Sequence, residues 1–175
     1  MTVPAARRAG LALVGLLLVA GGAACSSGPA TLAGDDLAGE VASAASEAIG
    51  VEVDAVACDE ELPVEVGQTT TCRADLGDAG AMDVEVEVVG ADGELAVRPR
   101  AAVIDRAEVA EDLKALLKSR FERSFQADCG QAGSEVLPPD ATFVCRARDA
   151  DGRRSVRVTV TDVAGTLSFE VLDES

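Results

Sequence analysis

The chain has 175 residues, of which 31 are acidic and 15 basic, and its formal net charge is −16. Nucleic acids and anionic lipid headgroups are bound by clustered Lys and Arg, so this charge balance argues against both as partners. The sequence contains no Trp, no Tyr and no His, which argues against aromatic stacking sites for sugars or unpaired bases and removes the commonest general base of enzymes.

The N-terminal segment resembles a bacterial lipoprotein export signal. Two arginines precede an apolar run over residues 9–20, and small residues over 21–24 lead to Cys25. A membrane-spanning helix needs about 20 apolar residues, so an uncleaved helix is the weaker alternative. General signal cleavage that leaves an unmodified thiol stays open, because Gly22 stands where lipoprotein signals usually have an aliphatic residue. We predict a signal peptide over residues 1–24 and a lipidated Cys25, with diacylglycerol on the sulfur and acyl chains such as palmitate. The protein would then be anchored at the outer face of the cell membrane.

Four cysteines remain after Cys25 is assigned to the lipid. They form two pairs of similar spacing, Cys58 with Cys72 and Cys129 with Cys145. In the oxidising compartment of an exported protein, paired cysteines are expected to form disulfides. A zinc site normally uses Cys-x-x-Cys knuckles or histidine, and the sequence has neither. We therefore predict one disulfide within each pair, no metal site and no cofactor.

An internal repeat surrounds the second cysteine of each pair. Residues 71–74 (Thr-Cys-Arg-Ala) align with residues 144–147 (Val-Cys-Arg-Ala). Valines then alternate with mostly polar residues over 84–88 and 156–160, and each run leads through a glycine-containing turn into a last short strand. This pattern predicts a β-hairpin in both copies.

A helix is predicted before each cysteine pair. The first extends over residues 36–49 and ends at Gly50, with apolar residues spaced for one face: Leu37, Val41, Ala44, Ala45 and Ala48. The second begins at Asp105, whose spacing to Glu108 suits a capping box. Its apolar side consists of Val109, Leu113, Leu116, Leu117 and Phe121. We expect both apolar faces to pack on a sheet.

These elements predict an α+β fold of two tandem modules. In each module one helix packs on a small antiparallel sheet of about four strands, and one disulfide joins the first two strands. Residues 25–34 would be the lipidated cysteine and a flexible tether. The first module would span residues 35–100 and the second residues 101–175, with the boundary just after Pro99.

The first copy resembles a known family. Val56-Ala57-Cys58, Leu62-Pro63 with Gly67, and Thr71-Cys72 are similar to domain-of-unknown-function family 4333, found in lipoproteins of high-GC Gram-positive bacteria. The second copy is a degenerate match that keeps Cys129, Leu137, Pro138 and Cys145 and lacks a glycine equivalent to Gly67. The resemblance implies an extracytoplasmic module with a disulfide, and it supplies no catalytic residue.

The remaining candidate sites favour ordinary structural roles. Asp149, Asp151 and Gly152 match part of a calcium loop, but the downstream ligands are missing, so a hairpin turn is the better interpretation. The acidic segment 59–61 is expected to be an exposed loop. With no histidine and no spare thiol, we expect no catalytic activity.

The two copies differ in charge. Residues 34–100 contain 17 acids and three arginines, a net charge of −14, whereas residues 101–175 contain 14 acids and ten bases, a net charge of −4. Glu85 and Glu87 of the first hairpin correspond to Arg157 and Thr159 of the second, where four more arginines lie nearby: Arg146, Arg148, Arg153 and Arg154. Two hypotheses follow: that the two charged faces dock against each other, or that the molecule has one acidic end for a basic partner.

The sequence thus predicts a lipid-anchored, extracytoplasmic binding protein without catalytic activity. Its partner would be an envelope protein or peptide, and no nucleic acid is expected. Two alternatives stay open, a structural or cation-buffering surface protein and a hydrolase that uses carboxylates. The ligand and the oligomeric state are also open at this point.

Overall fold

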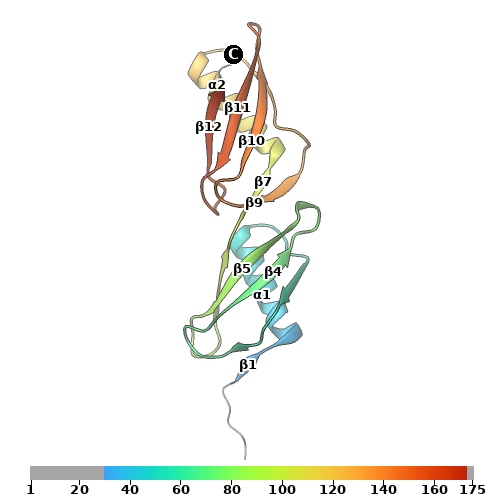
Figure 1. Cartoon of the computed structure of the whole chain (residues 1–175), viewed down its shortest axis with the longest axis vertical. Coiled ribbons are helices and arrows are strands. Elements are labelled where there is room, and N and C mark those ends of the chain that lie inside the picture. The colour runs from blue at the N-terminus through green and yellow to red at the C-terminus, as the bar shows by residue number, and fades with distance from the viewer. Residues whose placement is uncertain (1–29, 173–175) are drawn as a thin grey trace, which may run out of the picture.

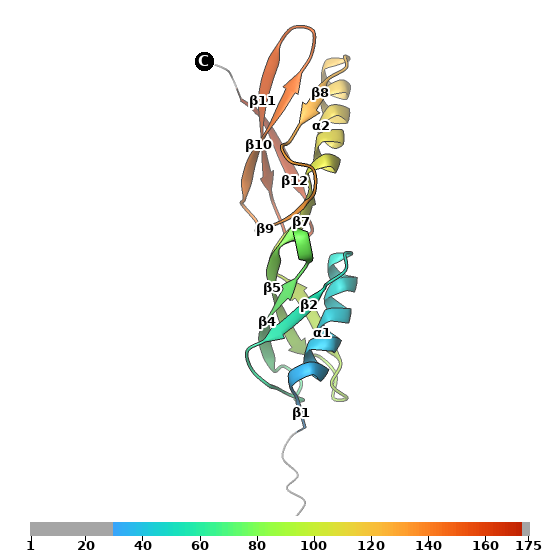
Figure 2. The same ribbon diagram turned by 90° about the vertical axis from the view of Figure 1, so that its right-hand side faces the viewer.

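The computed structural model of the protein describes residues 30–172. Two modules lie end to end along the long axis of the molecule (Figure 1), and both helices lie on the same side of their sheets (Figure 2). The predicted α+β fold of two modules is confirmed. The predicted signal peptide and Cys25 lie outside the described residues. Neither helix within residues 30–172 combines the length and the apolar character that crossing a bilayer requires.

The first module contains one α-helix and a four-stranded antiparallel sheet of order β2-β4-β5-β6. A short additional pair, β1 with β3, lies beside it. The elements are β1 (Thr31–Leu32), α1 (Gly34–Ile49), β2 (Ala55–Cys58), β3 (Leu62–Pro63), β4 (Thr69–Asp75), the 3-10 helix η1 (Gly77–Ala79), β5 (Ala81–Val88) and β6 (Leu95–Pro99).

The second module repeats this arrangement. Its four-stranded antiparallel sheet has the order β12-β11-β10-β8, and β7 pairs with β9 in the position that the β1–β3 pair has in the first module. The elements are β7 (Ala102–Asp105), α2 (Arg106–Phe121), β8 (Gln126–Asp128), β9 (Ser134–Leu137), β10 (Thr142–Arg148), β11 (Arg153–Val160) and β12 (Leu167–Leu172).

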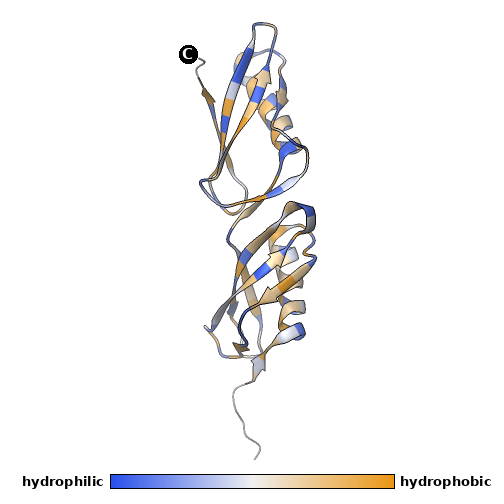
Figure 3. Cartoon of the chain, turned by 45° about the vertical axis from the view of Figure 1, so that its right-hand side comes forward, coloured by the Kyte–Doolittle hydropathy of each residue, from blue (hydrophilic) through white to orange (hydrophobic). Residues whose placement is uncertain are grey.

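Alternation of side chains places each core between the sheet and its helix. Hydrophobic and hydrophilic residues alternate along the long strands of both sheets, as Figure 3 shows. Strands β4 and β10 have the same burial pattern from end to end. The valines of β5 and β11 that the repeat predicted as buried are fully covered: Val84, Val86, Val88, Val156, Val158 and Val160. The internal repeat is therefore a repeat in packing as well as in sequence.

The two helices occupy equivalent places but bury different side chains. Leu37, Val41 and Ala45 of α1 are fully buried, whereas the equivalent row of α2 is Val109, Leu113 and Leu117. α1 packs against both β2 and β6, while α2 contacts mainly β8 and β7.

Three details of the predicted helices are wrong. Ala48 is exposed rather than buried. Leu116 and Phe121 are 41% and 38% exposed, because the side of α2 that faces β12 is left partly uncovered. Asp105 caps α2 by accepting hydrogen bonds from the backbone N–H groups of Ala107 and Glu108, but residues 30–172 show no reciprocal bond from the Glu108 side chain to Asp105, so only half of the capping box forms.

The segments predicted as tether and as irregular loops are partly regular. Thr31–Leu32, within the predicted tether 25–34, pairs with Leu62–Pro63, and α1 begins at Gly34. Leu62 is 1% exposed, so burial of its side chain explains why this stretch is ordered. In the second module the equivalent segment forms β9, which the irregular composition around Gly133 and Pro138 concealed.

The chain passes between the modules through a segment that serves both cores. β6 ends at Pro99 and β7 begins at Ala102. Ala101 and Val103 pack against the first core, whereas Ala102 and Ile104 belong to the second. This alternation is the two-residue period of a β-strand, with one face turned to each module.

Candidate functional site

Both predicted disulfides are confirmed, Cys58–Cys72 and Cys129–Cys145. Cys58 and Cys72 are directly paired in the register of β2 and β4. Cys129 follows the last residue of β8 and bonds to Cys145 of β10. The Cα atoms of the partners are 4.2 Å and 4.1 Å apart. Each disulfide therefore fastens the long connection between its two strands to the edge of the sheet.

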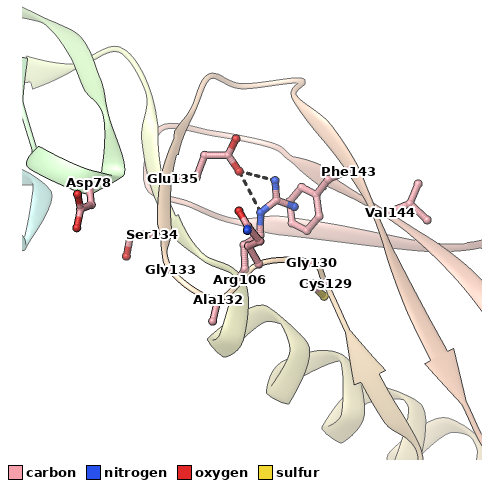
Figure 4. Close-up of a pocket in the computed structure, with 11 residues that line it drawn as sticks. Asp78, Arg106, Cys129, Gly130, Ala132, Gly133, Ser134, Glu135, Phe143 and Val144 are labelled. Atoms are coloured by element: carbon pink, nitrogen blue, oxygen red, sulfur yellow. Dashed lines mark hydrogen bonds and ion pairs between the residues drawn. The ribbon is translucent and has the colours of Figure 1, made fainter.

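A cleft of about 670 Å³ lies at the junction of the modules. Asp78 of η1 contributes from the first module, and all the other lining residues belong to the second (Figure 4). They come from three places: Arg106 at the start of α2, the loop and strand after the second disulfide, and β10. These residues are Cys129, Gly130, Gln131, Ala132, Gly133, Ser134, Glu135, Phe143 and Val144.

Arg106 is the best-positioned charged side chain of this cleft. Its guanidinium carbon lies 3.6 Å from the ring centroid of Phe143, and its Nε and Nη2 atoms donate to Glu135 Oε2 at 3.1 and 2.5 Å. The side chain of Arg106 is only 16% exposed, whereas that of Glu135 is 48% exposed. Stacking on an aromatic ring and a two-pronged contact with a carboxylate restrict the rotamers of the arginine. Arg106 is thus preorganised, with its charge partly balanced by Glu135.

The loop over residues 129–135 adds backbone groups to the cleft. Gly130 and Gly133 have φ angles of 102° and 134°, a conformation that residues with a side chain rarely adopt. The carbonyl oxygen of Gly133 accepts a hydrogen bond from the backbone N–H of Arg106 at 3.1 Å, and the N–H of Gly130 donates to Asp128 Oδ1 at 2.9 Å. The first bond holds the loop against the start of α2, and the second fixes the turn just after β8.

This arrangement can bind a polar ligand through charge, hydrogen bonds and one aromatic ring. Glu135 accepts, Arg106 donates, and the exposed Gln131 and Ser134 can do both. Arg106, Glu135 and Phe143 could not be recognised as a group from the sequence, because they come from three separate elements. No local motif links them, although the glycines of the loop indicated an unusual backbone.

The turn over residues 149–152 is a tight hairpin turn, as predicted. Asp149 Oδ1 accepts hydrogen bonds from the backbone N–H groups of Asp151 and Gly152, both at 3.0 Å. The Asp149 side chain is 1% exposed and lies 3.4 Å and 3.5 Å from guanidinium nitrogens of Arg123 and Arg154. Its oxygens are therefore occupied by protein donors. Residues 30–172 contain no grouping of acidic and cysteine side chains suited to a metal ion.

The charged faces of the two sheets form ion pairs within their own modules. Glu87 lies 2.6 Å from Arg98, and Glu85 pairs with both Arg98 and Arg100. The hydrogen bond to Glu87 raises the pKa of Arg98 above its ordinary value. In the second module Arg157 pairs with Glu170 at 2.6 Å. The hypothesis that the two faces dock against each other is wrong for this structure, because the modules are stacked end to end (Figure 1).

Comparison with known proteins identifies the first module. Residues 17–93 match the model of the family described as Domain of unknown function (DUF4333). Searches of curated proteins and of solved structures return no match. The matched segment includes α1, the Cys58–Cys72 disulfide and strands β2 to β5, and it starts before Cys25. Residues 17–93, which include most of the first module, thus carry the DUF4333 domain.

Proposed function

We propose that the protein is a lipid-anchored binding protein of the extracytoplasmic face of the cell membrane, which recognises a ligand without converting it chemically. The observation that carries this proposal is the junction cleft with its preorganised Arg106. A cleft that combines a restrained cation, an aromatic ring and neighbouring polar groups is typical of a recognition site.

The export and anchoring part of the proposal is supported by the N-terminal sequence and by the disulfides. Both cysteine pairs are bonded, and structural disulfides persist mainly in exported proteins. The family model already matches from residue 17, so its matched region includes the cysteine that would carry the lipid.

Anchoring is tested by replacing the proposed acylated thiol. Wild-type protein should enter the membrane fraction, and its N-terminal peptide should carry acyl chains by mass spectrometry. Cys25→Ser should release the protein from the membrane or leave an unprocessed precursor. An unacylated N-terminus at Cys25 in the wild type would contradict this part.

Ligand recognition is tested in intact cells with a photoreactive amino acid in the full chain. At the exposed Gln131, within the cleft, it should give a discrete cross-linked product. At the exposed Ser43 of α1 it should not. The product should weaken when Arg106→Gln or Glu135→Gln is added. No product from Gln131, or the same products from both positions, would refute a recognition role for the cleft.

A further inference from the structure

Three exposed arginines of the second module lie together on the sheet face that α2 does not cover. Arg146 and Arg148 are two residues apart on β10 and are exposed. Arg153 of β11 is directly paired with Arg148 in the register of the two strands. With the neighbouring strand β8 they line a groove of about 290 Å³. We call Arg146, Arg148 and Arg153 the arginine surface.

The three arginines differ from most others in the structure because they lack ion-pair partners. Within residues 30–172, none of them forms an ion pair with a carboxylate. Seven arginines of the same range do: Arg73, Arg98, Arg100, Arg106, Arg123, Arg154 and Arg157. Asp128 is the nearest acid in the register, opposite Arg146, and its Oδ1 already accepts from the Gly130 N–H.

This placement is unfavourable for folding. Like charges directly opposite each other on neighbouring strands destabilise a sheet. The protein has an excess of acidic residues, yet none stands at either position of the Arg148–Arg153 pair. Such a local conflict between stability and sequence is expected at functional sites.

The first module shows that the fold does not require these arginines. In the equivalent cross-strand pair, Asp75 and Ala81 take the places of Arg148 and Arg153. Arg73, the equivalent of Arg146, is neutralised by Asp83 at 3.1 Å. The arginine surface is therefore a property of the second module alone.

The geometry points to a specific kind of partner. Side chains two residues apart on one strand repeat at about 6.8 Å, and an extended peptide presents alternate side chains at the same interval. We propose that the arginine surface binds an acidic, extended peptide segment of a partner protein, with carboxylates on alternate residues. Arg146 and Arg148 would each meet one carboxylate, and Arg153 would share the second with Arg148.

The charge of the molecule favours a short acidic peptide over a long polyanion. The net charge is −16 overall and −14 over residues 34–100. A long anionic polymer would be repelled outside the arginine surface, whereas a short segment needs only the local positive potential. None of the three arginines lines the junction cleft that contains Arg106, so the two sites can be tested independently.

The test uses the full chain in a non-ionic detergent and a fluorescein-labelled peptide of alternating Thr and Glu, with binding measured by fluorescence anisotropy at low salt. The double variant Arg148→Gln with Arg153→Gln should weaken binding about tenfold. The matched control is Arg73→Gln with Arg157→Gln, which removes the same charge from exposed, paired arginines and should change the affinity less than about threefold. Arg106→Gln should leave peptide binding unchanged.

Three outcomes would overturn the proposal. A peptide with Gln in place of Glu could bind equally well, or short-chain polyphosphate could bind more tightly than the peptide and depend on the same arginines. In the third, the full chain would not bind the peptide, whereas a chain truncated after Leu172 would. The protein's own Asp173 and Glu174, rather than a partner, would then be the ligand of the arginine surface. Loss of binding by misfolding is excluded if the Arg148→Gln, Arg153→Gln variant keeps or raises its melting temperature, which removal of a like-charged pair should allow.

Discussion

Removing the second disulfide should destabilise the second module by about 3 kcal/mol. Cys129 and Cys145 are separated by 16 positions, and closing a loop of that size lowers the entropy of the unfolded chain by an amount equivalent to about 3 kcal/mol. The corresponding separation for Cys58 and Cys72 is 14, so the same argument gives nearly the same loss for the first module. The double variants Cys129→Ala with Cys145→Ala and Cys58→Ala with Cys72→Ala are therefore matched perturbations.

Thermal unfolding of the full chain, followed by far-UV circular dichroism and by calorimetry, measures this loss. Intrinsic tryptophan or tyrosine fluorescence cannot serve, because the sequence contains neither residue. For a module of this size, about 3 kcal/mol lowers the melting temperature by roughly 12 to 24 °C. A reductant should lower the melting temperature of the wild type by a comparable amount. It should not change the melting temperature of the variant that lacks all four of these cysteines. A loss below about 1 kcal/mol in either double variant would refute the loop-entropy reasoning.

Three other predictions follow from unequal details of the two modules. Ala33 precedes α1 without a side-chain cap, and Glu122 ends α2 at a φ of 55°. Ala33→Asp and Glu122→Gly should each stabilise by about 1 kcal/mol in urea unfolding, and no gain would contradict the capping argument. Leu113→Ala should cost about 2 to 5 kcal/mol because Leu113 is fully buried, whereas Leu116→Ala, at a 41% exposed position, should cost under about 1 kcal/mol. Hydrogen bonds from the side chain and backbone of Thr166 lower the pKa of Asp162. The ionised Asp162 carboxylate therefore stabilises the folded protein above the unfolded pKa of about 4, and this stabilisation is lost as the pH falls through the lower folded pKa. Asp162→Asn should unfold more readily than wild type at neutral pH, and the difference should shrink as the pH falls below about 4. A difference that stays constant down to pH 2 would exclude this cause.

The fold was largely predictable because its main signals are local. Valine alternation predicted β5 and β11, and Gly50 predicted the end of α1. Gly50 has the left-handed backbone conformation expected at the end of a helix. The spacing of the cysteines predicted both disulfides. The elements that could not be predicted depend on long-range pairing. β9 pairs with β7, although α2 and β8 lie between them in the sequence. Neither strand has an alternating pattern long enough to be recognised alone.

The candidate site was less predictable for the same reason. Arg106 meets Glu135 and Phe143 only after α2, β9 and β10 are assembled. The arginine surface was partly visible, since the repeat showed several arginines near the second hairpin. Register was needed to show that Arg148 and Arg153 stand opposite each other while Arg157 has its own acidic partner.

The strand that joins the modules has a consequence for dissection of the molecule. Val103 of β7 and Val136 of β9 pack against the first core, although both strands lie in the second module. A fragment ending at Pro99 would lose this cover and expose apolar surface of the first core. A fragment beginning at Ala102 would in turn expose Val103 and Val136. Each half should thus be less soluble alone than in the full chain, and a third copy appended to the C-terminus would need to bring a strand like β7 with it.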